Sequence, residues 1–248
     1  MAIHFRIATW NLERSGVHRK SRIPRQLNTI SRLNADVWIL TETHSAVALN
    51  GYNSLASQRD PSYHNDGEIA VTIWSRWPLR QIETDDPILT VCGDFQPPFG
   101  EKRILVYGTI ITYGADGVRE GLARPWERHR ESVRKQTAEW RKLREQYPRH
   151  LCCVAGDFNE NLDGTRWYGV ADAKEGIKHG LAAARMHCVT LANMRVPPFN
   201  LKRAAVDHIC LSDGLSVSSR LEAWDGTENG VQLSDHNGML AHLELPDE

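Results

Sequence analysis

Short apolar segments recur along the whole chain, and their spacing is the feature that most constrains the fold. They are rich in Val, Ile, Thr and Trp, which favour extended backbone, and each is far shorter than the roughly 20 residues that span a bilayer. The segments are residues 5–10, 37–40, 69–74, 104–112, 151–155, 206–211 and 239–245. We therefore predict seven β-strands, and no interaction with a membrane.

Longer stretches with helical spacing separate some of these strands. Apolar residues recur at intervals of three and four in residues 23–33 and 126–147, and a weaker pattern covers residues 173–187. Residues 84–103, which contain Asp-Pro and Pro-Pro steps, are predicted to form a long irregular excursion between strands. A chain of 248 residues without a repeat or a linker favours one domain, residues 1–248, built on a layered sheet core.

The net charge of −1 does not indicate a partner, but the positive charge is clustered. Residues 14–35 contain six Arg or Lys and no acidic residue, and residues 119–144 contain nine Arg or Lys and four Glu. Such patches suit a polyanionic partner. Well-solvated helix faces are the alternative interpretation.

The five cysteines have no CxxC spacing, which predicts free thiols in a reducing compartment. The N-terminal residues lack the layout of a signal peptide and lead directly into the first predicted strand. We therefore expect a cytoplasmic protein, most simply a monomer.

Polar side chains stand where several predicted strands end. Any one of them could be a turn residue or a helix cap, but five such places favour a shared site. Carboxylate and amide oxygens are the ligands that Mg²⁺ and Mn²⁺ prefer. The residues concerned are Asn11, Glu13, Glu42, Tyr113, Asp157, Asn159, Asp207, Asp235 and His236.

Several other chemistries lack their motifs in this sequence. There is no HExxH and no zinc-finger spacing of Cys and His, which disfavours a zinc site. The absence of GxxxxGK[ST] and of GxSxG argues against a P-loop NTPase and an α/β-hydrolase.

The order of the motifs resembles the endonuclease/exonuclease/phosphatase superfamily, which includes DNase I and the exonuclease III-type apurinic/apyrimidinic endonucleases. The resemblance covers residues 5–245 and implies an α+β fold, a four-layer α-β-β-α sandwich of two packed mixed sheets flanked by helices. It also implies hydrolysis of a phosphoester with Mg²⁺ or Mn²⁺ as cofactor. The motifs are Thr9-Trp-Asn-Leu, Leu40-Thr-Glu, Gly67-Glu-Ile-Ala-Val-Thr-Ile-Trp-Ser-Arg76, Gly156-Asp-Phe-Asn159, Val206-Asp-His-Ile-Cys-Leu-Ser212 and Ser234-Asp-His236.

The same resemblance assigns the metal ligands. Glu42 matches the principal ligand, assisted by Asn11 and by Asp235 or Glu13. A hard cation bound there would neutralise the charge that develops on the phosphoryl oxygens.

The catalytic roles also follow from matching motifs. Asp157 would orient or deprotonate the attacking water, and Asn159 would hold a phosphate oxygen. His236 would face the scissile phosphate as a base or as a charge stabiliser, hydrogen-bonded to Asp207, with Tyr113 near the phosphate. The Asp207 partner would set the imidazole tautomer and favour its charged form.

The substrate is less constrained than the chemistry. We expect nucleic acid, DNA more than RNA, bound through its backbone, because basic residues flank the predicted site. Trp126 could stack near a base or pack at the start of a helix. A phosphatase, or a phosphodiesterase acting on phospholipids or small molecules, is the alternative on this scaffold, and a non-catalytic binding module is disfavoured because the motif residues are all present. The substrate-binding candidates are Arg14, Arg19, Arg22, Arg119, Arg124 and Trp126.

Overall fold

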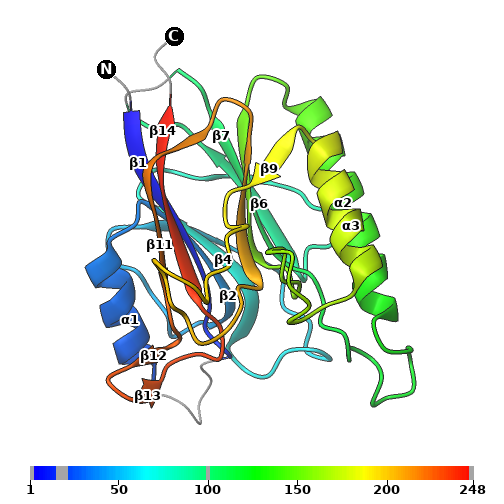
Figure 1. The fold of residues 1–248 in the computed structure, drawn as a ribbon. Coiled ribbons are helices and arrows are strands. Elements are labelled where there is room, and N and C mark those ends of the chain that lie inside the picture. Colours follow the sequence, from blue (N-terminus) through cyan, green and yellow to red (C-terminus); the bar gives the residue numbers. More distant parts are fainter. Residues whose placement is uncertain (1–2, 15–21, 99–100, 246–248) are drawn as a thin grey trace.

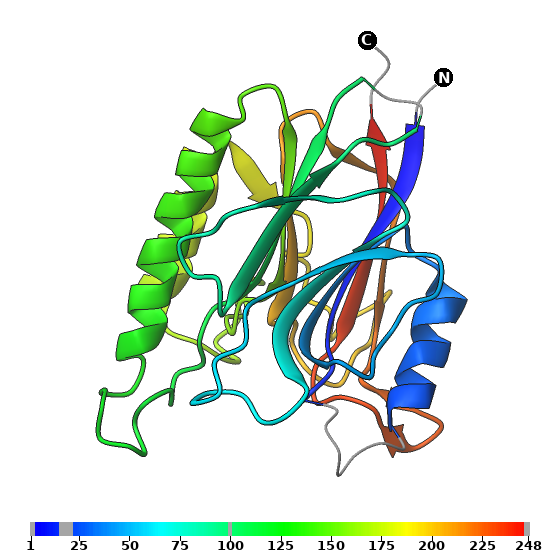
Figure 2. The same ribbon diagram turned by 180° about the vertical axis from the view of Figure 1, so that it is seen from behind.

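The computed structural model describes residues 3–14, 22–98 and 101–245. Two six-stranded sheets lie face to face, with helix α1 on the outer face of one and helices α2 and α3 on the outer face of the other (Figure 1 and, from behind, Figure 2). The fold is therefore an α+β sandwich of four layers, as the resemblance implied.

The first sheet has the strand order β11-β14-β1-β2-β4-β3. β1 and β2 run parallel, joined by α1 (Arg22–Leu33), and the other neighbours are antiparallel. The strands are β1 (Ile3–Asn11), β2 (Val37–His44), β3 (Asn53–Ala56), β4 (Glu68–Ser75), β11 (Ser216–Trp224) and β14 (Gly238–Leu245).

The second sheet has the order β5-β6-β7-β8-β10-β9 and repeats this plan. β7 and β8 run parallel, joined by α2 (Glu127–Gln146), and α3 (Ala171–Ala183) follows β8. A hairpin of β12 (Thr227–Glu228) and β13 (Val231–Gln232) precedes β14. The strands are β5 (Arg80–Ile82), β6 (Thr90–Phe95), β7 (Ile104–Ile110), β8 (Leu151–Asp157), β9 (Met186–Cys188) and β10 (Asp207–Ser212).

Successive side chains along a strand point to opposite faces, so one sheet contributes to two apolar cores. Phe5 and Ile7 of β1 enter the apolar layer between the sheets, whereas Ala8 and Trp10 face α1. Complete burial of large side chains such as Ile7 and Trp10 stabilises the sandwich by about 2 kcal/mol each. With the sheets packed in this way, the last residues of β1 and β8 lie at the same end of the sandwich. This end is the one away from the two chain termini (Figure 1).

The seven predicted strands and three predicted helices are confirmed, with shifted ends. Residues 84–103 were wrongly predicted to be irregular, because β6 lies within them and is buried throughout. The third helix ends at Ala183 rather than at residue 187, since Arg185 takes a left-handed conformation with φ 52° and β9 follows.

The five cysteines are buried free thiols, as predicted. No helix in the described part of the chain is long and apolar enough to cross a membrane.

Gly156 is the position where the backbone leaves least room for a side chain. Its φ is +141°, and a β-carbon there would lie 2.0 Å from the carbonyl oxygen of Thr109 on β7. We expect Gly156→Ala to lower the free energy of unfolding by about 3 kcal/mol or more, because β7 and β8 would have to separate. Urea denaturation measures the change.

Gly121 provides the matched control. It also has a positive φ, +68°, but among the described residues nothing lies within 4 Å of a β-carbon built there. Gly121→Ala should lower stability by only about 1 kcal/mol, from backbone strain alone. Equal losses in the two variants would show that the close approach to Thr109 is unimportant.

Candidate active site

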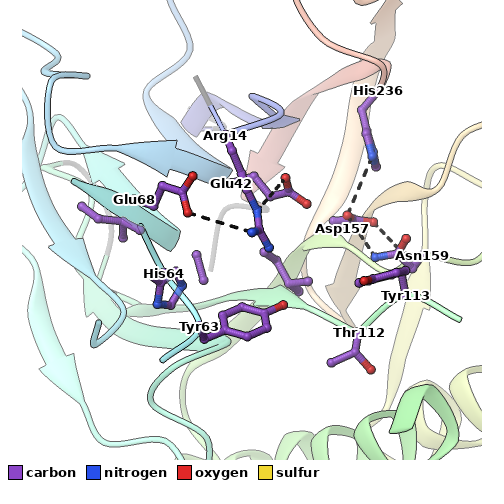
Figure 3. A pocket seen from close by; sticks show the side chains of 13 residues that line it. Arg14, Glu42, Tyr63, His64, Glu68, Thr112, Tyr113, Asp157, Asn159 and His236 are labelled. Carbon is purple, nitrogen blue, oxygen red and sulfur yellow. Dashed lines mark hydrogen bonds and ion pairs between the residues drawn. The ribbon is translucent and has the colours of Figure 1, made fainter. Parts of the chain in front are cut away.

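A cleft of about 190 Å³ opens at the end of the sandwich where β1 and β8 end (Figure 3). It is lined by side chains from both sheets and from the loops that follow their strands. Those with polar groups are Arg14, Glu42, Tyr63, His64, Glu68, Thr112, Tyr113, Asp157, Asn159 and His236. The predicted residues Glu42, Tyr113, Asp157, Asn159 and His236 are thus brought together.

Asp157 ends β8 and is 1% exposed, yet three hydrogen bonds fix its carboxylate. Its Oδ1 accepts the backbone N–H of Asn159 at 2.8 Å. Its Oδ2 accepts the side-chain amides of Asn11 at 3.0 Å and Asn159 at 3.1 Å. Because Asn11 ends β1, the carboxylate is held from both sheets at the point where Asp157 lines the cleft (Figure 3).

Asn159 follows in a left-handed conformation, with φ 49°. Its Nδ2 also donates to the carbonyl oxygen of Ile111 at 2.9 Å. Both hydrogens of this amide are therefore engaged within the protein. A donor role toward a phosphate oxygen would require one of these bonds to be released.

His236 forms the other side of the cleft. Its Nδ1 donates to Oδ2 of Asp207 at 2.7 Å, and its Nε2 lies 4.0 Å from Oδ2 of Asp157 and 3.8 Å from Oδ1 of Asp235. Burial acts to lower the pKa of His236, but the carboxylates of Asp207 and Asp157 outweigh it and raise that pKa well above its usual value. The raised pKa favours the imidazolium form of the ring, whose Nε2 lies near the carboxylates of Asp157 and Asp235.

The pKa of Asp157 is shifted toward neutrality. Burial is the largest cause, and together with the charges of Asp207 and Glu42 it outweighs the opposing charge of His236, so that the pKa rises from 3.8 to about 7. A carboxyl group with such a pKa exchanges its proton readily near neutral pH.

Glu42 stands on the opposite wall, in a left-handed conformation with φ 45°. Its backbone carbonyl accepts the N–H of Arg14 at 2.8 Å, and its Oε2 lies 3.4 Å from Nε of Arg14. The same guanidinium lies 3.9 Å from Oε2 of Glu68 and 5.4 Å from the ring centre of Tyr63. Arg14 therefore stands between two carboxylates within the cleft (Figure 3).

The donor set suits a hard divalent cation. Ligand atoms of Asp157, Asp207 and His236 lie within 4.8 Å of one another. Oδ1 of Asp207 is buried and has no hydrogen-bond partner in the described part of the chain. The side chain of Glu42 is 27% exposed and reaches the same cleft. The carboxylate oxygens of Asp157 and Asp207, and those of Glu42 in the same cleft, are of the kind that Mg²⁺ and Mn²⁺ prefer.

The other predicted metal ligands differ in their surroundings. Asn11 is fully buried behind Asp157, and its Oδ1 accepts the backbone N–H of Glu13 at 2.8 Å. The carboxylate of Glu13 accepts a hydrogen bond from Nη1 of Arg22 at 2.6 Å, and Glu13 is not among the described residues that line the cleft. Asp235, 43% exposed, stands at the rim beside His236.

The predicted substrate-binding residues are dispersed. Only Arg14 lines the cleft among those that the structure describes, since Arg22 is paired with Glu13 and both Arg119 and Arg124 are exposed in the loop before α2. Arg19 lies outside the described residues.

Trp126 packs at the start of α2, as one of its two interpretations predicted. Its ring stands edge-on to His129 at 5.1 Å and to Tyr168 at 5.3 Å, and it would contact a β-carbon on Gly114.

Many basic residues of α2 are ion-paired, which favours the solvated-face interpretation of that patch. The pairs with the described residues are Arg128–Asp116, Arg130–Asp172, Lys135–Glu131, Arg141–Glu145 and Lys142–Asp85.

Four polar residues of the cleft were missed by sequence reasoning: Tyr63, His64, Glu68 and Thr112. The first two lie in a turn-rich loop with no apolar periodicity. Glu68 begins β4 inside a motif that was recognised, and its position as an acidic residue at the start of an apolar strand was the available signal. Burial acts to raise the pKa of Glu68, but hydrogen bonds from Asn65 and the charge of Arg14 lower it overall.

Comparisons with known proteins agree with this architecture. Residues 8–236 match the sequence model of the Endonuclease/Exonuclease/phosphatase family. No curated protein matches the chain in sequence.

Several solved structures have the same fold. An endonuclease/exonuclease/phosphatase from Bacteroides vulgatus is 19% identical, with a TM-score of 0.70 over 98% of this chain and 100% of that chain. The AP endonuclease LMAP from Leishmania major is 12% identical, with a TM-score of 0.69 over 98% and 88%. The 3′ phosphatase NExo from Neisseria, solved with a product DNA hairpin, is 16% identical, with a TM-score of 0.65 over 96% and 98%.

The raised pKa of Asp157 should appear in the stability of the metal-free protein. Folding takes up a proton between the unfolded pKa of 3.8 and the folded pKa of about 7, so stability falls as pH rises through that window. Asp157→Asn removes this titration. The free energy of unfolding of Asp157→Asn, relative to that of the wild type, should therefore rise by on the order of 2 kcal/mol between pH 5 and pH 7.5. Urea denaturation in EDTA measures it.

Asp172→Asn is the control for this series. The pKa of Asp172 is lowered by a hydrogen bond from Arg130, so its titration lies below the window. Its difference from the wild type should not change between pH 5 and 7.5. Parallel stability curves for Asp157→Asn and the wild type would contradict the raised pKa.

Proposed function

The chain belongs to the Endonuclease/Exonuclease/phosphatase family, and from this premise we propose that it hydrolyses backbone phosphodiesters of nucleic acid, DNA or RNA, by metal-dependent attack of water. The observation that carries the proposal is the pair formed by Asp157 and His236, whose Oδ2 and Nε2 lie 4.0 Å apart at the cleft that Glu42 also lines. With their shifted pKa values, Asp157 can take a proton near neutral pH, while His236 already holds one.

Glu42 is the proposed principal ligand of Mg²⁺ or Mn²⁺, assisted by Asn11 and Asp235. The cation supplies Lewis acidity toward the phosphoryl oxygens and lowers the pKa of a bound water. Glu42 is preferred over the group of Asp157, Asp207 and His236 because metal binding needs a neutral imidazole, whereas His236 carries a proton held by Asp207.

Asp157 is the proposed base. Its carboxylate would accept a hydrogen bond from the attacking water and take its proton, while the amides of Asn11 and Asn159 keep its orientation. A pKa near neutrality suits this transfer better than the ordinary value of an aspartate.

His236 is the proposed donor to the phosphate. Its Nε2–H would stabilise charge on a phosphoryl or leaving oxygen, and Asp207 would keep the ring protonated and oriented. Arg14 and Tyr113 border the same cleft and are proposed to contact phosphate oxygens. The names of two similar structures, an AP endonuclease and a 3′ phosphatase bound to DNA, support nucleic acid as the substrate class.

The metal requirement is tested with supercoiled plasmid, single-stranded DNA, abasic duplex, RNA and a generic phosphodiester, each with Mg²⁺, Mn²⁺ or EDTA. We expect hydrolysis only with a divalent cation. Glu42→Gln should lower kcat/KM about 100-fold or more and raise the Mg²⁺ concentration that half-saturates the rate, because a ligand charge is lost.

Glu131→Gln, on the exposed face of α2, removes the same charge away from the cleft and should behave like the wild type. Hydrolysis that survives EDTA, or survives Asp157→Ala, would overturn the mechanism. Cleavage of the generic ester alone would refute the nuclease assignment and favour a small-molecule or lipid phosphodiesterase.

The role of Asp207 is tested by the pH profile. Because its carboxylate raises the pKa of His236, Asp207→Asn should lower that pKa, so the imidazolium is lost at lower pH. The alkaline limb of kcat/KM should move down by about one pH unit or more, with kcat reduced about 100-fold. Asp213→Asn, in the exposed turn at the other end of β10, is the control. An unshifted alkaline limb would mean that His236 does not act as an acid.

A further inference from the structure

Exposed aromatic side chains gather on one rim of the cleft. β7 and β8 are parallel, and β10 is antiparallel to both β8 and β9. The loops that follow β7, β8 and β9 therefore leave the sheet at the same end of its strands, the end where Asp157 lies. Three large rings on these loops are exposed: Tyr113 by 46%, Trp167 by 48% and Tyr168 by 36%.

A series of contacts connects Tyr168, the chain neighbour of Trp167, to the cleft. Tyr168 stands edge-on to Trp126 at 5.3 Å, and a backbone hydrogen bond from Gly114 helps to lower the pKa of the Tyr168 hydroxyl, which burial raises overall. Trp126 in turn covers Gly114, next to Tyr113, which lines the cleft. We call Tyr113, Trp126, Trp167 and Tyr168 the aromatic rim.

Positive charge accompanies the aromatic rim. The guanidinium of Arg195 lies 4.2 Å from the ring centre of Trp167, and Arg166 is exposed beside it in the chain. The loop of residues 189–206 contains Arg195, Lys202 and Arg203 and no acidic residue. Nη1 of Arg203 donates to the carbonyl oxygen of Asp235 at 2.5 Å, which brings this charge beside His236.

An adjoining groove, which we call the acidic groove, has the reverse character. It shares Arg14 and Tyr113 with the cleft and is lined by four acidic residues and two arginines. These charged residues are Asp60, Asp86, Asp116, Glu120, Arg14 and Arg128. A polyanion is repelled there and attracted toward the aromatic rim.

We propose that the aromatic rim is a subsite for single-stranded nucleic acid, whose bases stack on Trp167 and Tyr168 while Arg195 and Arg203 contact its phosphates. The inference rests on the proposed function, which it deepens by naming the form of the substrate. Stacking on exposed rings beside a basic strip is the usual means of binding a single strand without sequence preference. Paired bases in a duplex do not offer their faces to such rings, so a duplex would contact only the positive charges.

The test measures binding in EDTA, where no hydrolysis is expected, by fluorescence anisotropy of labelled 12-nucleotide dT and rU strands and a matched duplex. Trp167→Ala should weaken single-strand binding about 10-fold and duplex binding little, and Trp167→Phe should retain most of the affinity. Leu122→Ala, which truncates a 69% exposed side chain in the acidic groove, should leave binding unchanged. A loss of affinity for the dT strand, the rU strand or both supports the proposal. A loss for only one of them tells whether the subsite takes DNA or RNA.

Arg195→Ala tests the charge, with Arg141→Ala on α2 as the matched control. Arg195→Ala should weaken binding about 5-fold and reduce its salt dependence, whereas Arg141→Ala should do neither. Three results would overturn the subsite: no single-strand binding by the wild type, unchanged binding in Trp167→Ala, or an equal loss for the duplex. Hydrolysis is measured in parallel with the panel of substrates and cations. Its failure on every substrate would count against the proposed function and not against the subsite, because binding in EDTA requires no hydrolysis.

Discussion

The structure of the site depends on one buried hydrogen bond between the two sheets, from the amide of Asn11 to the carboxylate of Asp157. Asn11 ends β1 and Asp157 ends β8, and neither is more than 1% exposed. A second connection, from His236 to Asp207, also joins segments of different sheets. Because the apolar layer between the sheets sets their separation, the geometry of these bonds is a property of the whole core. Loss of Asp157 would leave the buried side-chain amide of Asn11 without this acceptor, which destabilises the folded state.

The sequence patterns predicted the central strands because these strands are buried on both faces and have continuous apolar runs. Short strands at the sheet edges, such as β3 and β5, expose most of their side chains and leave no such pattern. β6 was missed for another reason. Its Asp94 is fully buried, which is tolerated only because Arg80, Arg103 and His150 bind its carboxylate, and these partners are distant in sequence.

The same distinction explains which site residues could be predicted. Polar residues that directly follow an apolar run within a strand, such as Glu42 and Asp157, could be found because the strand fixes their position. Residues delivered by loops, such as Tyr63, reach the cleft through turns that no periodicity encodes. Glu13 also follows β1, but its ion pair with Arg22 directs it away, and the chain itself gave no sign of that choice between partners.

A cleft lined by Glu42, Glu68 and Asp157 would repel a phosphodiester unless positive charge compensated it. Arg14 and the imidazolium of His236 compensate part of this charge, and on the proposed function a divalent cation supplies more. None of these groups draws a long polyanion from solution, because they lie inside the cleft. Attraction over longer distances must come from charges outside the cleft, and the charges beside the aromatic rim and in the acidic groove differ in sign. On the proposed subsite, a substrate enters the cleft from the side of the loops after β7, β8 and β9, where the exposed rings and the positive charge lie.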